Sequence, residues 1–501
     1  MTHAEPPPPA SPQPSSPPTR PPGPVRCSSP YRTLLTVVAA FVGLFLVIRT
    51  IAVEPFGVPT GSMAPALIGH HRQGACPRCG YTVRVGRPAR GSDADHFANV
   101  ACPNCEQRFS LVEARDLNGD RLLVDKNVYG LRRPRRWEMV VFRCPDPDPD
   151  EHGKPYVKRL VGLPGETILL REGDAYADGE IVRKGLAEVR ETTVPVFDMN
   201  FPPTGGGWAA RWVAWSGAPR RPEGLGEPVS PPVIEENALV LDASESPRKM
   251  AGATYRHWNL DDRCEEPVRA WTAYDGAPRR LGQLPPAHDF VLTCEVEVTA
   301  AAPGGEASFA CRLLDGADAV SAELTVGPKG SGRVQLVREG HGEVAAAGGV
   351  ALEVGRTYAL EFAFVDRRVL LALDGRLVAS ADLPAVKNRD EVSRPLQLGS
   401  RGCRVVVRNL KLGRDVHYTT DYGEHGTRRP VTMKPGEHFV LGDNSGNSQD
   451  SRKWPSPGVP EADFIGKPFL IHQPLRVGRF ALGGAEREVQ TLDWSRLRWL
   501  H

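Results

Sequence analysis

The segment YVKRLVGLPGETILL, residues 156–170, gives the clearest indication of the fold class. It consists of short aliphatic runs separated by a turn that contains Gly and Pro. Two comparable segments precede it, RLLVDKNVYG at 121–130 and EMVVFR at 138–143. Short β-branched runs bounded by Gly and Pro are typical of strands joined by tight turns. Residues 118–170 are therefore predicted to form an antiparallel β unit in a mainly β chain.

Lys158 stands out within this unit because apolar neighbours surround it. Tyr156, Val157 and Leu160 lie beside it in the sequence. Successive side chains of a strand point to opposite faces, so we expect one of Lys158 and Arg159 to be buried and the other solvated. Burial lowers the pKa of a lysine, which is about 10.4 in water, and a neutral lysine can act as a general base. The ordinary alternative is a solvated strand lysine without a chemical role.

The N-terminal region combines a proline-rich segment with the most apolar run of the chain. Residues 1–30 contain twelve prolines and almost no large aliphatic side chains, which predicts a disordered tail. Residues 33–48 carry no charge, and the apolar run continues past Arg49 to a total of 21 residues. A helix needs roughly 20 residues to cross the hydrocarbon core of a bilayer. A single transmembrane helix over residues 31–53 is predicted, retained as an anchor rather than cleaved as a signal peptide.

Charges before this helix indicate its orientation. Arg20, Arg26 and Arg32 precede the helix against one acidic residue, Glu5. Lys and Arg are enriched in cytoplasmic segments, and long folded domains translocate largely regardless of charge. The prediction is a single-pass protein of the cytoplasmic (inner) membrane, with the lipid bilayer as a partner and the catalytic part on the extracytoplasmic side. The net charge of +2 gives no reason to expect a nucleic-acid partner.

The unit at residues 76–110 carries four cysteines in a metal-binding pattern. The segments CPRCG and CPNC place Cys76, Cys79, Cys102 and Cys105 in two CxxC pairs. Each CxxC turn presents two thiolates to one tetrahedral ion, and four thiolates leave no open position for a substrate. We therefore predict a zinc-ribbon-like unit with a structural zinc ion. Two disulfides, which an extracytoplasmic location permits, and iron in the same sulfur shell are the alternatives.

Residues 233–420 show a different β pattern. Alternating segments such as DFVLTCEVEV at 289–298 recur at regular spacing, and Asp374-Gly375 is a hairpin signal. The rhythm resembles the laminin-G-like and concanavalin-like jelly-roll β-sandwiches. We expect a folded spacer or a module that binds a glycan or a protein. No residue pattern marks a catalytic centre inside it.

After residue 420 the chain returns to the pattern of the first β unit. This return indicates that the cysteine unit and the β-sandwich are insertions into one discontinuous catalytic domain. The three parts of that domain are predicted at residues 54–75, at 111–232 together with a connecting region, and at 421–501.

Four segments resemble, in order along the chain, the signature boxes of type I signal peptidases, the serine endopeptidases of family S26. They are PTGSMAPAL at 59–67, GDRLLVDK at 119–126, YVKRLVGLPGE at 156–166 and GDNSGNSQDSR at 442–452. The resemblance implies a signal-peptidase-type antiparallel β catalytic domain behind a membrane anchor. It also implies a Ser/Lys dyad, with Ser62 as nucleophile and Lys158 as general base, and no cofactor for catalysis. The implied substrates are the signal peptides of exported preproteins, cut after small residues at A-x-A sites.

Further family roles fall on residues near this pair. Thr60 matches a hydroxyl residue that helps the backbone N–H of Ser62 to hold the oxyanion, and Ser448 matches a serine that orients the lysine. The residues that match the structure of the loop around Ser448 are Asp443, Asn444, Asp450 and Arg452. The residues that match the walls of shallow substrate pockets are Phe56, Val58, Met63, Leu67, Tyr156 and Val157. Plain core packing is the alternative for each pocket residue.

The sequence leaves several points open. Where the family often has Arg-Asp, this chain has Ser445-Gly446, which puts a peripheral salt bridge in doubt. A Ser/His/Asp triad is an alternative mechanism, since the chain has 13 histidines and His70 and His71 follow Ser62 closely. The alternative functions are a processing protease dedicated to a narrow set of substrates and a cell-surface binding protein with a vestigial peptidase scaffold.

Overall fold

A computed structural model describes most of the chain and divides it into two compact units, one ending at Ala52 and the other spanning Val53–His501. The described residues are 30–88, 92–205, 210–215, 230–260, 263–278, 283–421, 423–482 and 485–500. The predicted disordered tail lies outside them, apart from its last residue. Strands dominate the secondary structure, which confirms the prediction of a mainly β chain.

The described part of the first unit is helix α1 (Pro30–Ile51). It covers most of residues 31–53, which were predicted to cross a membrane. Among the helices in the described part of the chain, none is both long enough and apolar enough to span a bilayer. The predicted transmembrane helix is therefore not supported by the structure.

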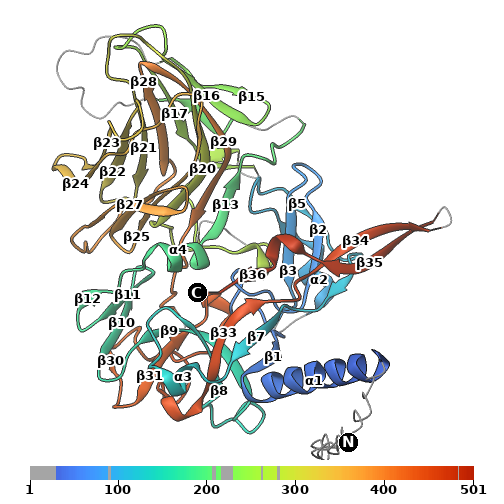
Figure 1. Cartoon of the computed structure of the whole chain (residues 1–501). Helices are drawn as coiled ribbons and strands as arrows, with labels where there is room; N and C mark the ends of the chain where they lie inside the picture. Colours follow the sequence, from blue (N-terminus) through green and yellow to red (C-terminus); the bar gives the residue numbers. More distant parts are fainter. Residues whose placement is uncertain are drawn as a thin grey trace, which may run out of the picture. The chain divides into compact units, whose positions relative to one another are not determined.

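The second unit contains an antiparallel sheet of eight strands, here called the terminal sheet because its strands come from both ends of the unit (Figure 1). In order across the sheet they are β1 (Val53–Gly57), β7 (Arg121–Asp125), β33 (Phe464–Ile471), β8 (Met139–Arg143), β9 (Pro155–Gly162), β31 (Glu437–Leu441) and β32 (Val459–Pro460), with β36 (Arg498–Trp499) paired to β33. The register places Lys158 opposite Val140 of β8, and Leu160 opposite Val440 of β31. Lys158 therefore lies on a strand, β9, that has a hydrogen-bonded neighbour on each side.

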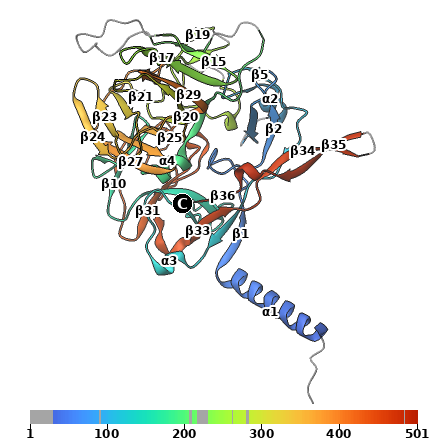
Figure 2. The same ribbon diagram turned by 45° about the horizontal axis from the view of Figure 1, so that its top comes forward.

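Two smaller sets of strands accompany the terminal sheet. A four-stranded sheet consists of β12 (Glu180–Ile181), β11 (Asp174–Ala177), β10 (Thr167–Arg171) and β30 (Val431–Thr432). Strands β34 (Leu475–Leu482) and β35 (Ala485–Leu492) form a two-stranded ribbon that extends outward in Figures 1 and 2.

Two larger antiparallel sheets face each other and enclose the largest apolar core of the unit (Figure 1). The first has the order β15 (Val233–Glu235), β16 (Ala238–Asp242), β29 (Cys403–Arg414), β20 (Phe290–Ala301), β25 (Thr357–Val365), β26 (Arg368–Leu373) and β27 (Arg376–Asp382), with β13 (Val194–Asp198) paired to β29. The second has the order β14 (Trp212–Ala214), β17 (Met250–Tyr255), β28 (Leu396–Arg401), β21 (Ser308–Leu314), β22 (Ala319–Thr325), β23 (Arg333–Arg338) and β24 (Gly342–Gly348). Alternate residues of β20, from Phe290 to Val298, point into the core, as a half-buried strand requires.

This β-sandwich recruits residues that precede 233, where the sequence predicts its start. Strand β13 pairs with β29 of the first sheet, and β14 pairs with β17 of the second. Helix α4 (Leu186–Thr192) leads directly into β13 and connects the four-stranded sheet to the sandwich. Helix α4 also carries Glu191, which accepts a hydrogen bond from Arg159 of β9.

The cysteine unit and the connecting segments complete the fold. The cysteine unit contains β3 (Thr82–Gly86), α2 (Asp93–Ala98), and β4 (Val100–Ala101) paired with β5 (Arg108–Phe109). Strand β3 lies in one sheet with β2 (His71–Ala75) and β6 (Asp116–Leu117), which flank residues 76–110 on either side in the sequence. The short elements elsewhere are α3 (Val128–Leu131), β18 (Trp258–Asn259), β19 (Cys264–Glu265) and the 3₁₀ turns η1 (Ala273–Asp275), η3 (Ser445–Asn447), η4 (Glu461–Asp463) and η5 (Trp494–Arg496).

Candidate active site

Ser62 lies in a tight segment between β1 and β2, residues 58–70, here called the Ser62 loop. The side chain is buried, with 8% of its surface exposed. A turn closes directly around it, because Ala64 N donates to the Gly61 carbonyl at 3.0 Å. The Ser62 carbonyl in turn accepts a hydrogen bond of 3.0 Å from Asn444 N. The backbone on either side of the hydroxyl is therefore fixed.

Lys158 approaches Ser62 from strand β9. Its Nζ lies 2.6 Å from Ser62 Oγ, and 3% of the lysine surface is exposed. Burial lowers the pKa of Lys158 to about 8, although the charge of Asp450 acts in the opposite direction. The Tyr156 ring, whose centroid is 5.2 Å from Nζ, forms part of the enclosure. The site thus joins a hydroxyl to an amine that loses its proton far more easily than a solvated lysine.

Arg159 corrects one expectation, since it is buried as completely as Lys158. Its Nε and Nη2 donate to the two carboxylate oxygens of Asp443 at 2.8 and 2.7 Å. Its Nη1 donates to Glu191 at 3.1 Å and to the Trp137 carbonyl at 2.7 Å. A buried guanidinium is tolerated when its donors are paired in this way. Alternation correctly separates the two side chains, but the second face is covered by acidic partners rather than by water.

The segment 442–452, here called the Ser448 loop, is braced by a buried ion pair. Arg452 Nε and Nη2 donate to the two oxygens of Asp450 at 2.9 and 2.8 Å. Burial would raise the pKa of Asp450, but the charge of Arg452 outweighs it and holds the pKa below the usual value. Arg452 also donates to Ser445 Oγ and to the Ser445 carbonyl, both at 2.7 Å. Ser445, where the sequence departs from the resembled family, therefore supports Arg452.

Ser448 is buried next to the Ser62 loop. A Cβ at Gly442 would lie 2.3 Å from Ser448 Oγ and 2.4 Å from the Ser62 carbonyl oxygen, so only glycine fits between the two serines. Within the described residues Ser448 Oγ makes no hydrogen bond to Lys158, and its hydroxyl helps to hold the pKa of Asp450 below the usual value. Thr60 lies two positions before Ser62 and is exposed.

The six expected pocket residues divide into two groups. Val58, Met63 and Leu67, all within the Ser62 loop, are buried in one apolar cluster with strands of the terminal sheet, which fits core packing. Phe56, Tyr156 and Val157 are only partly buried. These three retain surface that a substrate side chain could contact.

Neither histidine close to Ser62 in the sequence acts on it. The ring Nδ1 of His71 lies 2.9 Å from the Gly69 carbonyl, and burial lowers the pKa of His71 to about 4. His70 is exposed. In the described part of the chain, the Ser62 hydroxyl has Lys158 as its hydrogen-bond partner and no histidine.

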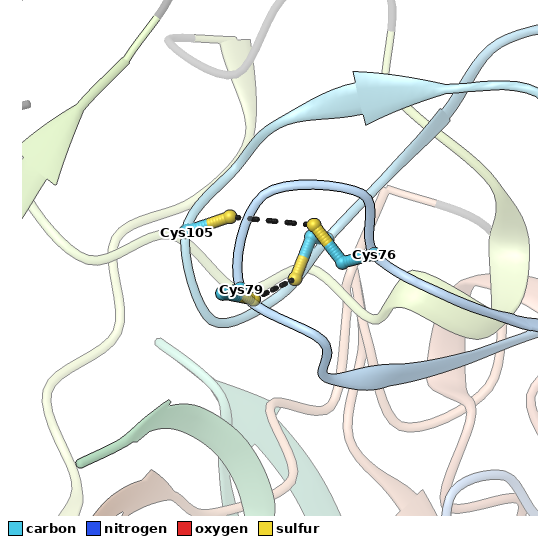
Figure 3. A group of neighbouring side chains, drawn as sticks. Cys76, Cys79 and Cys105 are labelled. Carbon is cyan, nitrogen blue, oxygen red and sulfur yellow. Dashed lines mark hydrogen bonds between the residues drawn. The ribbon is translucent and has the colours of Figure 1, made fainter. Parts of the chain in front are cut away.

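The four cysteines converge in the cysteine unit. Figure 3 shows Cys76, Cys79 and Cys105 on neighbouring turns with their sulfur atoms directed toward one another. The Cys76–Cys105 and Cys79–Cys102 sulfur pairs are each 3.6 Å apart, and all four sulfurs lie within 4.8 Å of one another. A disulfide bond is only about 2.05 Å long. Four sulfurs about 2.3 Å from one tetrahedral ion would be separated by about 3.8 Å, so the cluster has the dimensions of a metal site.

Several residues around the site were not predicted from the sequence. They are Glu191 of α4, and Tyr274 and Asp275 of η1. Asp275 Oδ1 accepts from the Asn444 amide at 2.7 Å, and the Tyr274 hydroxyl donates to the His70 carbonyl at 3.0 Å. No local pattern signals them, because each is distant in sequence from the loop that it contacts.

Comparisons with known proteins agree with the resemblance. The sequence profile of the family described as signal peptidase, peptidase S26, matches residues 111–206 and 372–472. Signal peptidase I of Pseudomonas aeruginosa is 29% identical over 144 residues, which are 28% of this chain and 36% of that protein. Signal peptidase I of Bacillus licheniformis is 37% identical over 65 residues, 13% of this chain and 32% of that protein. The chain spans about a third of the length of these relatives.

Solved structures give only a weak likeness. A carbohydrate-binding module, CBM66 of Bacillus subtilis, is 19% identical, covers 25% of this chain and 75% of its own, and has a TM-score of 0.19.

Proposed function

We propose that the chain is a signal peptidase that cleaves the signal peptides of exported preproteins through a Ser62/Lys158 dyad. The observation that carries the proposal is the 2.6 Å separation of Lys158 Nζ and Ser62 Oγ in a buried site. Among the relatives that the chain matches are proteins named signal peptidase I. The geometry and the similarity thus favour the same reaction class.

In the proposed reaction, neutral Lys158 Nζ accepts the proton of Ser62 Oγ while the oxygen attacks the scissile carbonyl. The resulting ammonium gives this proton to the leaving amine, and the signal peptide stays attached to Ser62 as an ester. Water then attacks the ester carbonyl and passes a proton to Nζ. Ser62 Oγ leaves the acyl group and regains its proton from the ammonium, which restores the dyad.

The oxyanion of the tetrahedral intermediate needs hydrogen-bond donors. Ser62 N–H and the Thr60 hydroxyl are the donors in this proposal, because Thr60 lies two positions before the nucleophile. Loss of one such donor typically lowers kcat by about 100- to 1000-fold. Ser448 Oγ, buried beside Gly442, is the candidate for orienting Lys158.

The cleavage specificity is the finer part of the proposal. Phe56, Tyr156 and Val157 keep partly exposed apolar surface beside the dyad. Shallow apolar walls accept alanine-sized side chains and reject larger ones, so we expect cuts after A-x-A sequences. A preprotein with alanine at positions −1 and −3 is the first substrate to test, with leucine at −1 as the mismatched control.

The experiment follows cleavage of this preprotein by the full chain and by Ser62→Ala. The variant removes the attacking oxygen, so we expect no product above background. Ser110→Ala, at an exposed serine of the cysteine unit, is the matched control and should cleave as the wild type does. Unchanged cleavage by Ser62→Ala would refute the assigned nucleophile.

The proposal includes a structural zinc ion at Cys76, Cys79, Cys102 and Cys105. Their sulfur spacing fits a tetrahedral ion, and a four-thiolate shell leaves no position for a substrate. The ion would hold the two CxxC turns together and take no part in hydrolysis. Elemental analysis of the purified chain should find one zinc per molecule, and Cys102→Ser should lose it.

Thiol labelling separates zinc from the disulfide alternative. After treatment with a chelator in the denatured state, without reductant, all four cysteines should react with an alkylating reagent. Disulfides would protect them from the reagent.

The membrane location rests on the sequence alone, namely the uncharged run 33–48 and the arginines before it. We propose that this segment anchors the chain with the peptidase on the extracytoplasmic side. Membrane fractionation and protease added outside the cytoplasmic membrane test the two statements separately. Recovery of the intact chain in the soluble fraction would refute the anchor.

A further inference from the structure

A short turn from the β-sandwich region reaches the Ser62 loop. This turn, η1, is closed by a hydrogen bond of 3.0 Å from Trp271 Nε1 to the Gly276 carbonyl. At its base, Arg414 Nη2 donates to the Trp271 carbonyl at 2.7 Å. Arg414 is the last residue of β29, which runs through the first sheet of the sandwich. The turn is therefore tied to the sandwich through Arg414.

Tyr274, at the centre of η1, packs against two glycines from two other regions. A Cβ at Gly61, next to Ser62, would lie 1.9 Å from the Tyr274 ring, and a Cβ at Gly86 of β3 would lie 2.0 Å from it. The hydroxyl donates to the His70 carbonyl at 3.0 Å. The Tyr274 ring thus contacts both the Ser62 loop, at Gly61, and the cysteine unit, at Gly86. Its hydroxyl is hydrogen-bonded to His70 at the end of the Ser62 loop.

Asp275 makes the corresponding contacts with the Ser448 loop. Its Oδ1 accepts from the side-chain amides of Asn444 at 2.7 Å and Asn447 at 3.1 Å. Asn444 N is the group that donates to the Ser62 carbonyl. Burial raises the pKa of Asp275 to about 6, and the two amides oppose this effect. Three hydrogen bonds therefore lie between the sandwich and the nucleophile: Arg414 to the Trp271 carbonyl, Asn444 to Asp275, and Asn444 N to the Ser62 carbonyl.

We propose that Tyr274 and Asp275 are positioning residues of the peptidase, which hold the Ser62 loop against the Ser448 loop so that hydrolysis depends on the docked β-sandwich. This inference rests on the proposed function for its kinetic readout. Neither side chain touches the reacting atoms. They act through Gly61 and Asn444, whose backbones fix the position of the Ser62 hydroxyl relative to Lys158.

The test compares Asp275→Ala with Asp275→Asn in the full chain. The asparagine Oδ1 can still accept from both amides, whereas alanine leaves them without this acceptor. Small displacements of reacting groups are costly, so we expect Asp275→Ala to lower kcat about 10-fold with KM within about twofold of the wild type. Asp275→Asn should retain at least half of the wild-type kcat. Asp390→Ala, at an exposed aspartate of the sandwich, is the matched control and should not differ from the wild type.

Hydrogen exchange supplies a second readout that does not require activity. In Asp275→Ala, the backbone amides of residues 58–70 and 442–448 should exchange faster, while those of β20 stay as protected as in the wild type. Equal kcat and equal exchange in wild type and Asp275→Ala would overturn the proposal. So would an equal loss of kcat in Asp275→Asn and Asp275→Ala, because the acceptor would then be irrelevant.

Failure of the proposed function gives a different result. If the wild-type chain cleaves no preprotein, the signal peptidase assignment fails, and the exchange experiment still decides whether η1 positions the two loops. If the wild type cleaves and only the Asp275 result is negative, the assignment stands and the positioning role fails.

Discussion

Two lysines, Lys158 and Lys184, are both almost completely buried but differ in their partners. Lys184 Nζ lies 3.1 Å from Asp366 and 2.7 Å from Asp415. Lys158 Nζ lies 2.6 Å from the uncharged Ser62 Oγ, and it forms no salt bridge within the described residues. Burial lowers the pKa of Lys158 to about 8. Burial acts on Lys184 too, but the charges of Asp366 and Asp415 hold its pKa well above the usual value.

Burial alone therefore does not make a lysine a base. Desolvation disfavours the charged ammonium, and a nearby carboxylate restores it. Lys184, with two carboxylates, is a structural cation between the connecting region and the sandwich. Lys158, whose nearest acidic groups do not reach salt-bridge distance, is poised to exchange a proton. Substitutions at either lysine or its neighbours should therefore have separable effects on cleavage and on stability.

The largest expected effect is that of Lys158→Met on cleavage. Methionine fills similar space without an amine, so the general base is lost and kcat/KM should fall about 1000-fold. The thermal midpoint should not fall, because the substitution also removes the cost of a buried amine. Lys387→Met, at an exposed lysine of the sandwich, is the control and should have no effect. Cleavage retained by Lys158→Met would remove the basis for the dyad.

Lys184→Met should affect stability rather than chemistry. The substitution leaves Asp366 and Asp415 buried without their cation, which typically costs about 3–5 kcal/mol of unfolding free energy. Denaturant unfolding of the full chain, followed by tryptophan fluorescence, measures the loss. At temperatures where the variant is folded, its kcat should stay close to that of the wild type. A variant as stable as the wild type would show that the two carboxylates do not depend on Lys184.

Below the pKa of Lys158, kcat/KM for cleavage should change about tenfold per pH unit. Lys158 must be neutral to accept a proton, so kcat/KM should rise with pH and level off above the pKa of about 8. Lys184→Arg should keep the same profile, because that site stays charged. A profile that is flat between pH 6 and 9, or that continues to rise toward pH 10.5, would contradict the assigned base.

The smallest effects are expected at Tyr156, whose ring encloses Lys158. Tyr156→Phe keeps the ring and removes the hydroxyl that donates to Glu151, so kcat/KM should change less than about twofold. Tyr156→Ala admits water to Nζ and should move the pH profile upward by about half a unit to one unit. If both variants shift the profile equally, the ring does not contribute to the low pKa.

Much of the site could be predicted from the sequence because its segments are short and ordered. Three of the four boxes contain Ser62, Lys158, Ser448 and Arg452, and the structure brings these segments together. Strand alternation correctly placed Lys158 and Arg159 on opposite faces. The β pattern also gave the mainly β class, and the two CxxC pairs led to the cluster of four sulfurs.

The remainder depends on contacts between distant segments. Arg159 was not recognised as buried, because its partners Asp443 and Glu191 lie 284 and 32 residues away. Strand β13 joins the sandwich through pairing with β29, which no pattern near residue 194 indicates. Tyr274 belongs to a turn with no motif of its own. Such packing is decided by tertiary contacts that a single sequence does not display.

The most direct test of the account is a titration of Lys158 itself. Lysine labelled with ¹³C at Cε reports the ionisation of each amine by NMR, and Lys158→Met and Lys184→Met assign the two resonances. We expect a midpoint of about 8 for Lys158 and a charged Lys184 up to at least pH 10.5. A midpoint near 10.5 for Lys158 would contradict the claim that this lysine is the general base for Ser62.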